Sequence, residues 1–263
     1  MAAMINAPVA ASLSASRLTI EIADRCLVHD LDLELAPATL ACILGRNGSG
    51  KTLTLTTIAG LRPVTTGEIR LRGKPFAAMT RRELALRRAL LTQTSEDPFP
   101  STVLEAVLVG RHPHLGLWQW ESATDLEIAR RRLAEVGLAD FEDRDLDTLS
   151  GGERRRVAIA AVLAQSADVL LLDEPTNHLD PHHQLDAMAL FRACADAGST
   201  VLMTLHDPGL AARHADTALL LFGTGEWLYG SVEEVLTAPH LSRLYGTQVR
   251  ELRWDTGRTF VYA

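Results

Sequence analysis

Long hydrophobic runs are missing from this sequence of 263 residues. None approaches the roughly 20 apolar residues that a membrane-spanning helix requires, so any role at a membrane must depend on a partner. Residues 1–16 are small and mostly apolar but include no basic residue, which a secretory signal peptide would carry near its start. We therefore expect residues 1–16 to be a disordered lead rather than a signal peptide.

Cysteine and basic residues are also in short supply. The cysteines Cys26, Cys42 and Cys194 show no paired spacing, which favours a reducing compartment over a disulfide framework. The 33 acidic residues outnumber the 26 basic ones, and the formal net charge is -7. Because nucleic-acid binding generally needs a basic surface, this balance argues against nucleic acid as a partner. Hydrophobic residues make up 47% of the chain, an ordinary content that allows a sizeable core.

Short apolar runs in this sequence have the pattern of strands that are buried on both faces of a parallel sheet. These runs are Leu40–Leu44, Val169–Leu172 and Thr200–Leu205. Helical patterns lie between them, over Thr52–Ala59, Asp125–Val136 and Glu153–Ala164. This alternation predicts an α/β fold with a mostly parallel sheet.

Residues 17–263 are expected to form a single domain that contains an inserted helical subdomain. The stretch from about residue 84 to residue 147 is helical in pattern and has few strand candidates. It also carries a loop at Asp97–Ser101. We therefore predict that 84–147 is a helical insertion into the sheet domain.

The carboxyl-terminal part shows turn and cap signals. Gly223–Gly225 predicts a hairpin turn, and a second hairpin is expected around Asp255–Gly257. Ser231 followed by Glu234 predicts a capping box at the start of a helix.

Residues 45–52 match the phosphate-loop pattern of glycines, a lysine and a hydroxyl residue at fixed spacing. The run consists of Gly45, Arg46, Asn47, Gly48, Ser49, Gly50, Lys51 and Thr52. The glycines let successive backbone amides point at phosphate oxygens, and the following helix adds its positive end. Lys51 is placed to reach the β- and γ-phosphates, and the Thr52 hydroxyl to ligate Mg²⁺. Since the chain holds only two lysines, a chance match is improbable, and we predict a nucleotide site.

Polar side chains follow the other two predicted strands. Asp173 and Glu174 stand where the second strand ends, so one carboxylate can hold the shell of Mg²⁺ and the other can orient or deprotonate an attacking water. His206 follows the third strand. Open α/β sheets bind ligands at the carboxyl ends of their strands, so we predict that His206 contacts the γ-phosphate.

The run Leu149-Ser150-Gly151-Gly152-Glu153 resembles the signature motif of ABC-type ATPases. The resemblance extends from about Leu18 to Tyr245. It implies a P-loop NTPase core with a mostly parallel sheet, an antiparallel β portion and an inserted helical subdomain. It also implies a homodimer in which the signature residues of one copy, Ser150, Gly151 and Gly152, complete the ATP site of the other.

The resemblance further implies roles for single residues. Glu174 is then the catalytic base of an ATP hydrolase and His206 the switch histidine. Gln93 is the Q-loop residue, which touches Mg²⁺ or water and links to the helical subdomain, while Asp173 and Thr52 complete the metal site. Asn177–Asp180 matches the D-loop at the dimer contact.

A narrower resemblance is to the motors of importers for iron-siderophore, haem and cobalamin. It is carried by Phe99–Val103, Val109–His114 and Glu174–Asp180. It implies integral membrane permease subunits, an indirect periplasmic substrate-binding protein, and a peripheral position on the cytoplasmic face of the inner membrane. The alternatives are an exporter motor and a soluble ABC ATPase without a transport role.

The sequence departs from the family pattern at the adenine site. ABC ATPases usually place an aromatic residue before the first strand turns, stacked on adenine, but Ile22 stands there. This substitution puts adenine recognition in question and leaves phosphate recognition unaffected. Phe76 and Tyr229 remain alternative sources of a ring.

Other patterns allow more than one interpretation. His178 and His182 have helical spacing, but Pro181 between them argues against one continuous helix and so against a metal site. Trp118 and Trp120 suit either a permease contact or packing within a loop. The run Arg154–Arg156 favours a solvated first turn of a helix, with a role near nucleotide or permease as the alternative.

Overall fold

The computed structural model describes residues 11–23, 25–93, 100–116, 118–255 and 257–263. Most of the expected loop at Asp97–Ser101 and residues 1–10 of the expected lead lie outside these ranges.

The larger sheet has the strand order β10-β9-β3-β8-β7-β6, and only the β10–β9 pair in it is antiparallel. Its strands are β3 (Leu40–Gly45), β6 (Arg88–Leu91), β7 (Val169–Leu172), β8 (Thr200–Thr204), β9 (Thr217–Leu221) and β10 (Trp227–Ser231). The predicted runs form β3, β7 and β8, and the predicted turn at Gly223–Gly225 joins β9 to β10. The α/β class with a mostly parallel sheet is therefore confirmed.

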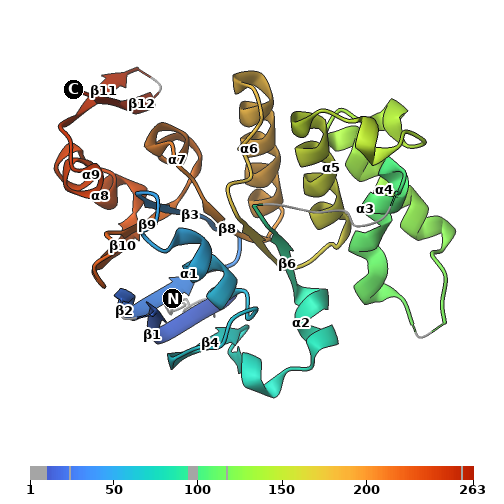
Figure 1. Ribbon diagram of the computed structural model, residues 1–263, viewed down its shortest axis with the longest axis horizontal. Helices are drawn as coiled ribbons and strands as arrows, with labels where there is room; N and C mark the ends of the chain where they lie inside the picture. The colour runs from blue at the N-terminus through green and yellow to red at the C-terminus, as the bar shows by residue number, and fades with distance from the viewer. Residues whose placement is uncertain (1–10, 24, 94–99, 117, 256) are drawn as a thin grey trace, which may run out of the picture.

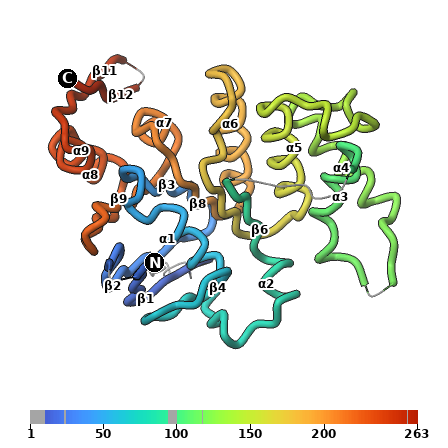
Figure 2. Tube along the Cα trace, viewed as in Figure 1, coloured from blue at the N-terminus to red at the C-terminus, as the bar shows by residue number. Residues whose placement is uncertain are grey.

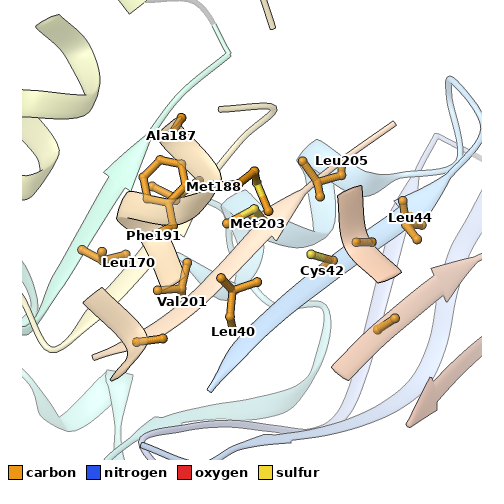
Figure 3. Packing of buried hydrophobic residues seen from close by; sticks show 14 of the residues in the cluster. Leu40, Cys42, Leu44, Leu170, Ala187, Met188, Phe191, Val201, Met203 and Leu205 are labelled. Atoms are coloured by element: carbon orange, nitrogen blue, oxygen red, sulfur yellow. The ribbon is translucent and has the colours of Figure 1, made fainter. Parts of the chain in front are cut away.

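Both faces of the larger sheet are buried, as the apolar runs predict. Along β3, Leu40, Cys42 and Leu44 belong to one core cluster, and Ala41 and Ile43 belong to another. Figure 3 shows the first cluster, in which side chains of β3 and β8 lie against Met188 and Phe191 of α6 (Pro181–Asp196). The alternation of side chains along a strand thus supplies a core on each side of the sheet.

One face of the larger sheet is covered by helices. These are α5 (Gly151–Ala164), α6, α7 (Pro208–His214), α8 (Val232–Val235) and α9 (Ala238–Tyr245). Figure 1 shows α6 and α7 on the side of the sheet opposite to β1, β2 and β4. Ser231 caps α8 through the predicted capping box with Glu234.

The other face packs on an antiparallel sheet of order β2-β1-β4-β5. Its strands are β1 (Leu13–Ile22), β2 (Arg25–Leu35), β4 (Thr66–Leu71) and β5 (Lys74–Pro75), and β5 is followed by the short 3₁₀ helix η1 (Phe76–Ala78). Helix α1 (Lys51–Ile58) contributes Leu55 and Ile58 to the same core. This sheet is the antiparallel portion that the family resemblance implies.

The expectation of a disordered lead up to residue 16 is wrong for residues 13–16. They form the start of β1, where Leu13 pairs with Leu35 of β2 and with Leu71 of β4. Leu13 and Ala15 are buried and alternate with serines, a strand pattern that the small-residue composition concealed.

The helical part has a core of its own, which includes Val103, Leu133 and Val157. Its elements are α3 (Val103–Leu108), α4 (Ala123–Glu135), α5 and the 3₁₀ helices η2 (Val109–His114), η3 (Ala139–Phe141) and η4 (Leu146–Thr148). None of the helices among the described residues is long and apolar enough to cross a membrane.

The expected start of the helical subdomain at residue 84 is wrong. Residues 81–87 form α2 (Arg81–Arg87), capped by Thr80, and residues 88–91 form β6, the edge strand of the larger sheet. Ala89 and Leu91 are buried and β6 pairs with β7. The pattern did not separate helix from strand here because no glycine or proline lies between them.

The chain ends in the predicted hairpin, formed by β11 (Val249–Trp254) and β12 (Gly257–Tyr262). β12 packs on α7. Figure 2 shows this hairpin at the opposite end of the molecule from the helical part.

Candidate functional site

The loop between β3 and α1 can close tightly only because glycine stands at its start. A Cβ at Gly45 would lie 2.3 Å from the Ser49 Oγ and 2.7 Å from the Leu221 backbone oxygen. Gly48 and Gly50 have φ values of 78° and 100°, in the region that favours glycine. The loop therefore has the conformation that the phosphate-loop pattern predicts, and it leads directly into the first turn of α1.

Lys51 is buried at the first position of α1 and folds back over the loop. Its Nζ donates to the backbone oxygens of Gly45 and Arg46, at 3.0 and 3.3 Å. Burial lowers the pKa of Lys51, and the nearby carboxylates of Glu174 and Asp173 oppose that change. An anion placed at this loop would stabilise the charged ammonium group.

The Ser49 hydroxyl is a buried polar group that lacks a hydrogen-bond partner among the described residues. Such groups are rare in folded proteins and need an explanation. A phosphate at the loop would provide the missing partner, so the residues fit a nucleoside triphosphate.

Thr204 of β8 holds the acidic pair at the end of β7. Its Oγ1 donates to Asp173 Oδ1 at 2.6 Å and accepts from the backbone amide of Glu174 at 2.8 Å. Asp173 is only 1% exposed. One hydroxyl from the neighbouring strand thus fixes the position of both acidic residues.

The Glu174 carboxylate is contacted from three segments of the chain. Its Oε1 lies 2.6 Å from the His206 Nε2, while its Oε2 accepts from the Gln93 Nε2 at 2.9 Å and also from the Asn177 amide. The Glu174 side chain is 8% exposed and that of His206 is 43% exposed. The structure therefore brings together the three predicted catalytic residues, Glu174, His206 and Gln93.

A pocket of about 400 Å³ opens beside the phosphate loop. Residues from the loop line it, together with residues from the strand ends and from β1 and β2: Asn47, Gly48, Gly50, Lys51, Thr52, Gln93, Glu174, Ile22, Arg25 and Leu27. The lining thus includes both Glu174 and Ile22, the last residue of β1.

No aromatic ring lines this pocket among the described residues. Ile22 does line it and is 44% exposed. Phe76 is half-buried and packs against the core between the two sheets, where a Cβ at Gly60 would meet its ring. The Tyr229 hydroxyl donates to the backbone oxygen of Glu34. Neither ring is therefore at the pocket.

The signature residues stand at the start of α5, away from the pocket lining. Ser150 caps the helix in a capping box with Glu153. A Cβ at Gly151 would have no heavy atom within 4 Å, whereas one at Gly152 would lie 3.1 Å from the backbone oxygen of His178. This helix start presents an open surface next to the predicted D-loop.

Arg155 is the functional-site neighbour that the sequence interpretation missed. Its guanidinium donates to the backbone oxygens of Thr92 (2.7 Å), Asp173 (2.5 Å), Glu174 (2.8 Å) and Pro175 (3.3 Å). The residue is 6% exposed, so the expectation of a solvated turn over Arg154–Arg156 is wrong for Arg155. Burial lowers its pKa to about 10, against the opposing effect of Asp173 and Glu174. Helical spacing points Arg155 back toward the sheet, a signal that the run of three arginines hides.

The histidines of the 178–183 segment do not share one helix. Asp180 caps α6 and Pro181 is its first residue, which leaves His178 outside. His183 Nδ1 lies 2.8 Å from Asp180 Oδ2, and His182 Nε2 lies 3.5 Å from Asp186 Oδ2. Among the described residues no cluster of three or more potential ligands could hold a metal through histidine, cysteine and carboxylate groups alone.

Oxygen donors for Mg²⁺ converge on the pocket from a different set of residues. Thr52, Gln93 and Glu174 line it, and the Asp173 carboxylate is adjacent along the chain. Hydroxyl, amide and carboxylate oxygens are the ligands that this hard cation prefers, usually together with phosphate oxygens of a substrate. The donor set therefore fits Mg²⁺ bound with a nucleotide.

Trp118 and Trp120 are 97% and 86% exposed. Packing within a loop does not account for them, because almost none of either ring is covered by the described residues.

The sequence and the structure of this chain are similar to those of one protein family. The family model described as "ABC transporter" matches residues 28–177. The hemin import ATP-binding protein of Gloeobacter violaceus is 40% identical over 92% of this chain and 90% of its own length. The petrobactin import ATP-binding protein of Bacillus anthracis is 37% identical over 86% of this chain and 83% of its own length. Among solved structures, a transporter assigned to the metal-chelate ABC type, in an inward-facing conformation, superposes with a TM-score of 0.84 at 25% identity, over 96% of this chain and 98% of its own.

Proposed function

This chain belongs to the ABC transporter family of ATP-hydrolysing subunits, and from that premise we propose that it is the motor of an importer for an iron chelate or haem. One observation carries the catalytic part of the proposal. The Glu174 carboxylate is held by Gln93, Asn177 and His206, and Glu174 lines the same pocket as the phosphate loop.

The phosphate loop is proposed to hold the triphosphate. The backbone amides of 45–52 face the phosphates, Lys51 exchanges its two carbonyl contacts for β- and γ-phosphate oxygens, and the orphaned Ser49 hydroxyl gains a partner.

Thr52, Gln93 and Asp173 are proposed to hold Mg²⁺. When bound, the ion neutralises charge on the phosphates that it contacts. The Thr204 hydroxyl donates to Asp173 Oδ1 and so keeps that carboxyl group in one orientation.

Hydrolysis follows from the Glu174 environment. Glu174 accepts the proton of the attacking water, and Gln93 and His206 orient the carboxylate and the water. Once ATP is bound, His206 is placed to contact the γ-phosphate, because it stands at the end of β8 next to Glu174.

A second copy of the chain is proposed to complete each ATP site. Ser150, Gly151 and Gly152 present the amino-terminal end of α5, which favours an anion but has no phosphate loop of its own. Two copies in head-to-tail arrangement would each cover the other's γ-phosphate with this helix end.

The subunit is proposed to work beneath a membrane permease, on the cytoplasmic face of the inner membrane, with a periplasmic binding protein delivering the cargo. The exposed rings of Trp118 and Trp120 lie in the helical part and are suited to an apolar partner surface such as a permease. Import of iron chelate or haem is supported by the relatives, whose names describe hemin and petrobactin import.

Uptake in cells lacking this gene tests both the direction and the cargo class. Labelled iron is supplied as haem, as a ferric siderophore or as free salt, and labelled cobalamin is supplied separately. We expect loss of uptake of one chelate, restored by the wild-type gene and not by Lys51→Ala, because the ammonium partner of the phosphates is gone. Unchanged uptake of all of them, or accumulation of a compound inside the cells, would support a non-transport ATPase or an exporter instead.

A further inference from the structure

Successive carbonyl oxygens converge on the guanidinium of Arg155, a residue outside the predicted catalytic set. Those of Asp173, Glu174 and Pro175 all accept hydrogen bonds from it. In a strand, the carbonyl groups of successive residues point to opposite sides. Three consecutive carbonyl oxygens can therefore accept from one guanidinium only if the backbone turns sharply. Glu174 makes that turn with a φ of 46°, a conformation that is uncommon for residues other than glycine.

The same guanidinium also reaches the end of β6. Its Nη1 donates to the backbone oxygen of Thr92, the residue before Gln93. Gln93 in turn donates to the Glu174 carboxylate. One buried side chain thus holds both the backbone of Glu174 and the segment that carries a neighbour of its carboxylate.

We infer that Arg155 is a positioning residue for Glu174, which acts by fixing the turn that aims the catalytic carboxylate at the phosphate loop. This inference rests on the proposed role of Glu174 as base. A planar fork of donors can satisfy several carbonyls at once, and the compact ammonium of lysine cannot do so in the same geometry. The hydrogen-bond acceptors of Arg155 are backbone oxygens, so its contacts fix the course of the main chain.

The position of Arg155 in α5 gives this contact a second consequence. It lies on the helix that begins with Gly151 and Gly152, the residues proposed to meet the partner's nucleotide. A shift of this helix on closure of the dimer would move the guanidinium and hence the turn at Glu174. Arg155 therefore connects the signature surface of one copy to the hydrolytic residue in the same copy.

The test compares Arg155→Gln and Arg155→Lys with a matched control, Arg156→Gln. Arg156 is the next residue of α5, but its guanidinium donates to the backbone oxygens of Val136 and Gly137, away from the pocket. Phosphate release is measured against ATP concentration, and ATP affinity is measured by titration with a fluorescent nucleotide. We expect kcat to fall by about tenfold to a hundredfold in Arg155→Gln, with KM and affinity changed less than about twofold, since misplacement of a catalytic group affects the chemical step. The control should retain the wild-type kcat.

A double variant separates positioning from general stabilisation. If Arg155 acts through Glu174, Arg155→Gln adds no further loss to Glu174→Gln in single-turnover experiments, whereas independent structural effects would multiply. Thermal unfolding shows whether Arg155→Gln is folded, and if it is not, Arg155→Lys is judged by the same criteria.

The inference is overturned by a kcat of the folded variant within about twofold of wild type, by parallel losses of kcat and affinity, or by multiplied losses in the double variant. A wild-type kcat in Glu174→Gln alone would instead contradict the proposed base, and the inference with it. A slow Glu174→Gln beside a fully active Arg155→Gln removes only the inference.

Discussion

Single side chains at this site are held by neighbours that are mostly distant in sequence. Gln93, Asn177 and His206 meet at the Glu174 carboxylate, and Thr204 holds Asp173 beside it. A carboxylate with several partners has little rotamer freedom left, so in the proposed mechanism it needs little reorganisation to accept the proton of the attacking water. The end of the pocket at Ile22 is different, because Ile22 is partly exposed and carries no aromatic ring.

We expect Ile22→Tyr to bind ATP more tightly than the wild type. Base–aromatic stacking is worth about 1–3 kcal/mol per base in single-stranded nucleic-acid sites. The gain should lie at the low end of that range, about fivefold in Kd, because Ile22 already shields the base from some water. Titration of ATP and GTP into wild type, Ile22→Tyr and the ring-free control Ile22→Val measures it.

Wild-type protein is expected to discriminate poorly between ATP and GTP. A strong ATP preference in the wild type, with no gain from tyrosine, would mean that a residue outside the described pocket lining reads adenine.

At the scale of the element, α5 both packs into two cores and presents an exposed first turn. Val157 and Ala160 pack it into the helical core, and Ile159 and Leu163 pack it against the larger sheet. Its first turn, by contrast, is exposed at Gly151 and is capped by Ser150. Gly151 has space for a side chain and does not have a positive φ, so nothing within one copy of the chain requires glycine at this position.

Gly151→Ala is expected to raise stability and lower ATPase activity. Alanine in place of a helical glycine stabilises by about 0.5–1 kcal/mol, and the new methyl group meets no atom within one copy. In the proposed dimer the same methyl group would stand between the helix end and the partner's γ-phosphate. Thermal unfolding and phosphate release are measured on the same preparation.

Gly152→Ala serves as a contrast, because its Cβ would lie 3.1 Å from the His178 backbone oxygen and stability should not rise. Full activity of Gly151→Ala would argue against the sandwich.

At the scale of the whole molecule, the fold places the residues of the proposed ATP site on two surfaces. The pocket lies at the carboxyl ends of β3 and β7, while the signature surface lies at the start of α5 and is absent from the pocket lining. Within the described residues of one copy, Ser150, Gly151 and Gly152 do not line the pocket that contains the phosphate loop. In the proposed dimer, ATP bound at the pocket of one copy would therefore contact the signature surface of the other.

Glu174→Gln with Mg-ATP is expected to form a stable dimer. The amide cannot accept the proton of the attacking water, so the ATP that joins the two copies persists. Light scattering of the variant with and without Mg-ATP detects the change in mass, and Lys51→Ala under the same conditions should remain monomeric. A monomeric Glu174→Gln at high protein concentration would count against the head-to-tail arrangement.

Local sequence alone determined the buried strands, the phosphate loop and the acidic pair. Apolar runs and glycine spacing are short-range signals, so β3, β7 and β8 and the residues at their ends could be assigned without a structure. Family resemblance then supplied the roles of Gln93 and Ser150, which no spacing reveals.

Only the tertiary structure decided what long-range packing controls. It placed residues 13–16 in β1 and residues 88–91 in β6, since each strand is stabilised by partners far along the chain. It also showed that Arg155, which the sequence suggests is exposed, is a buried hydrogen-bond donor. Its acceptors come from the ends of two strands that contact α5 only in the folded chain. Sequence records which groups are present, and the convergence of separate segments determines which of them lose water and act together.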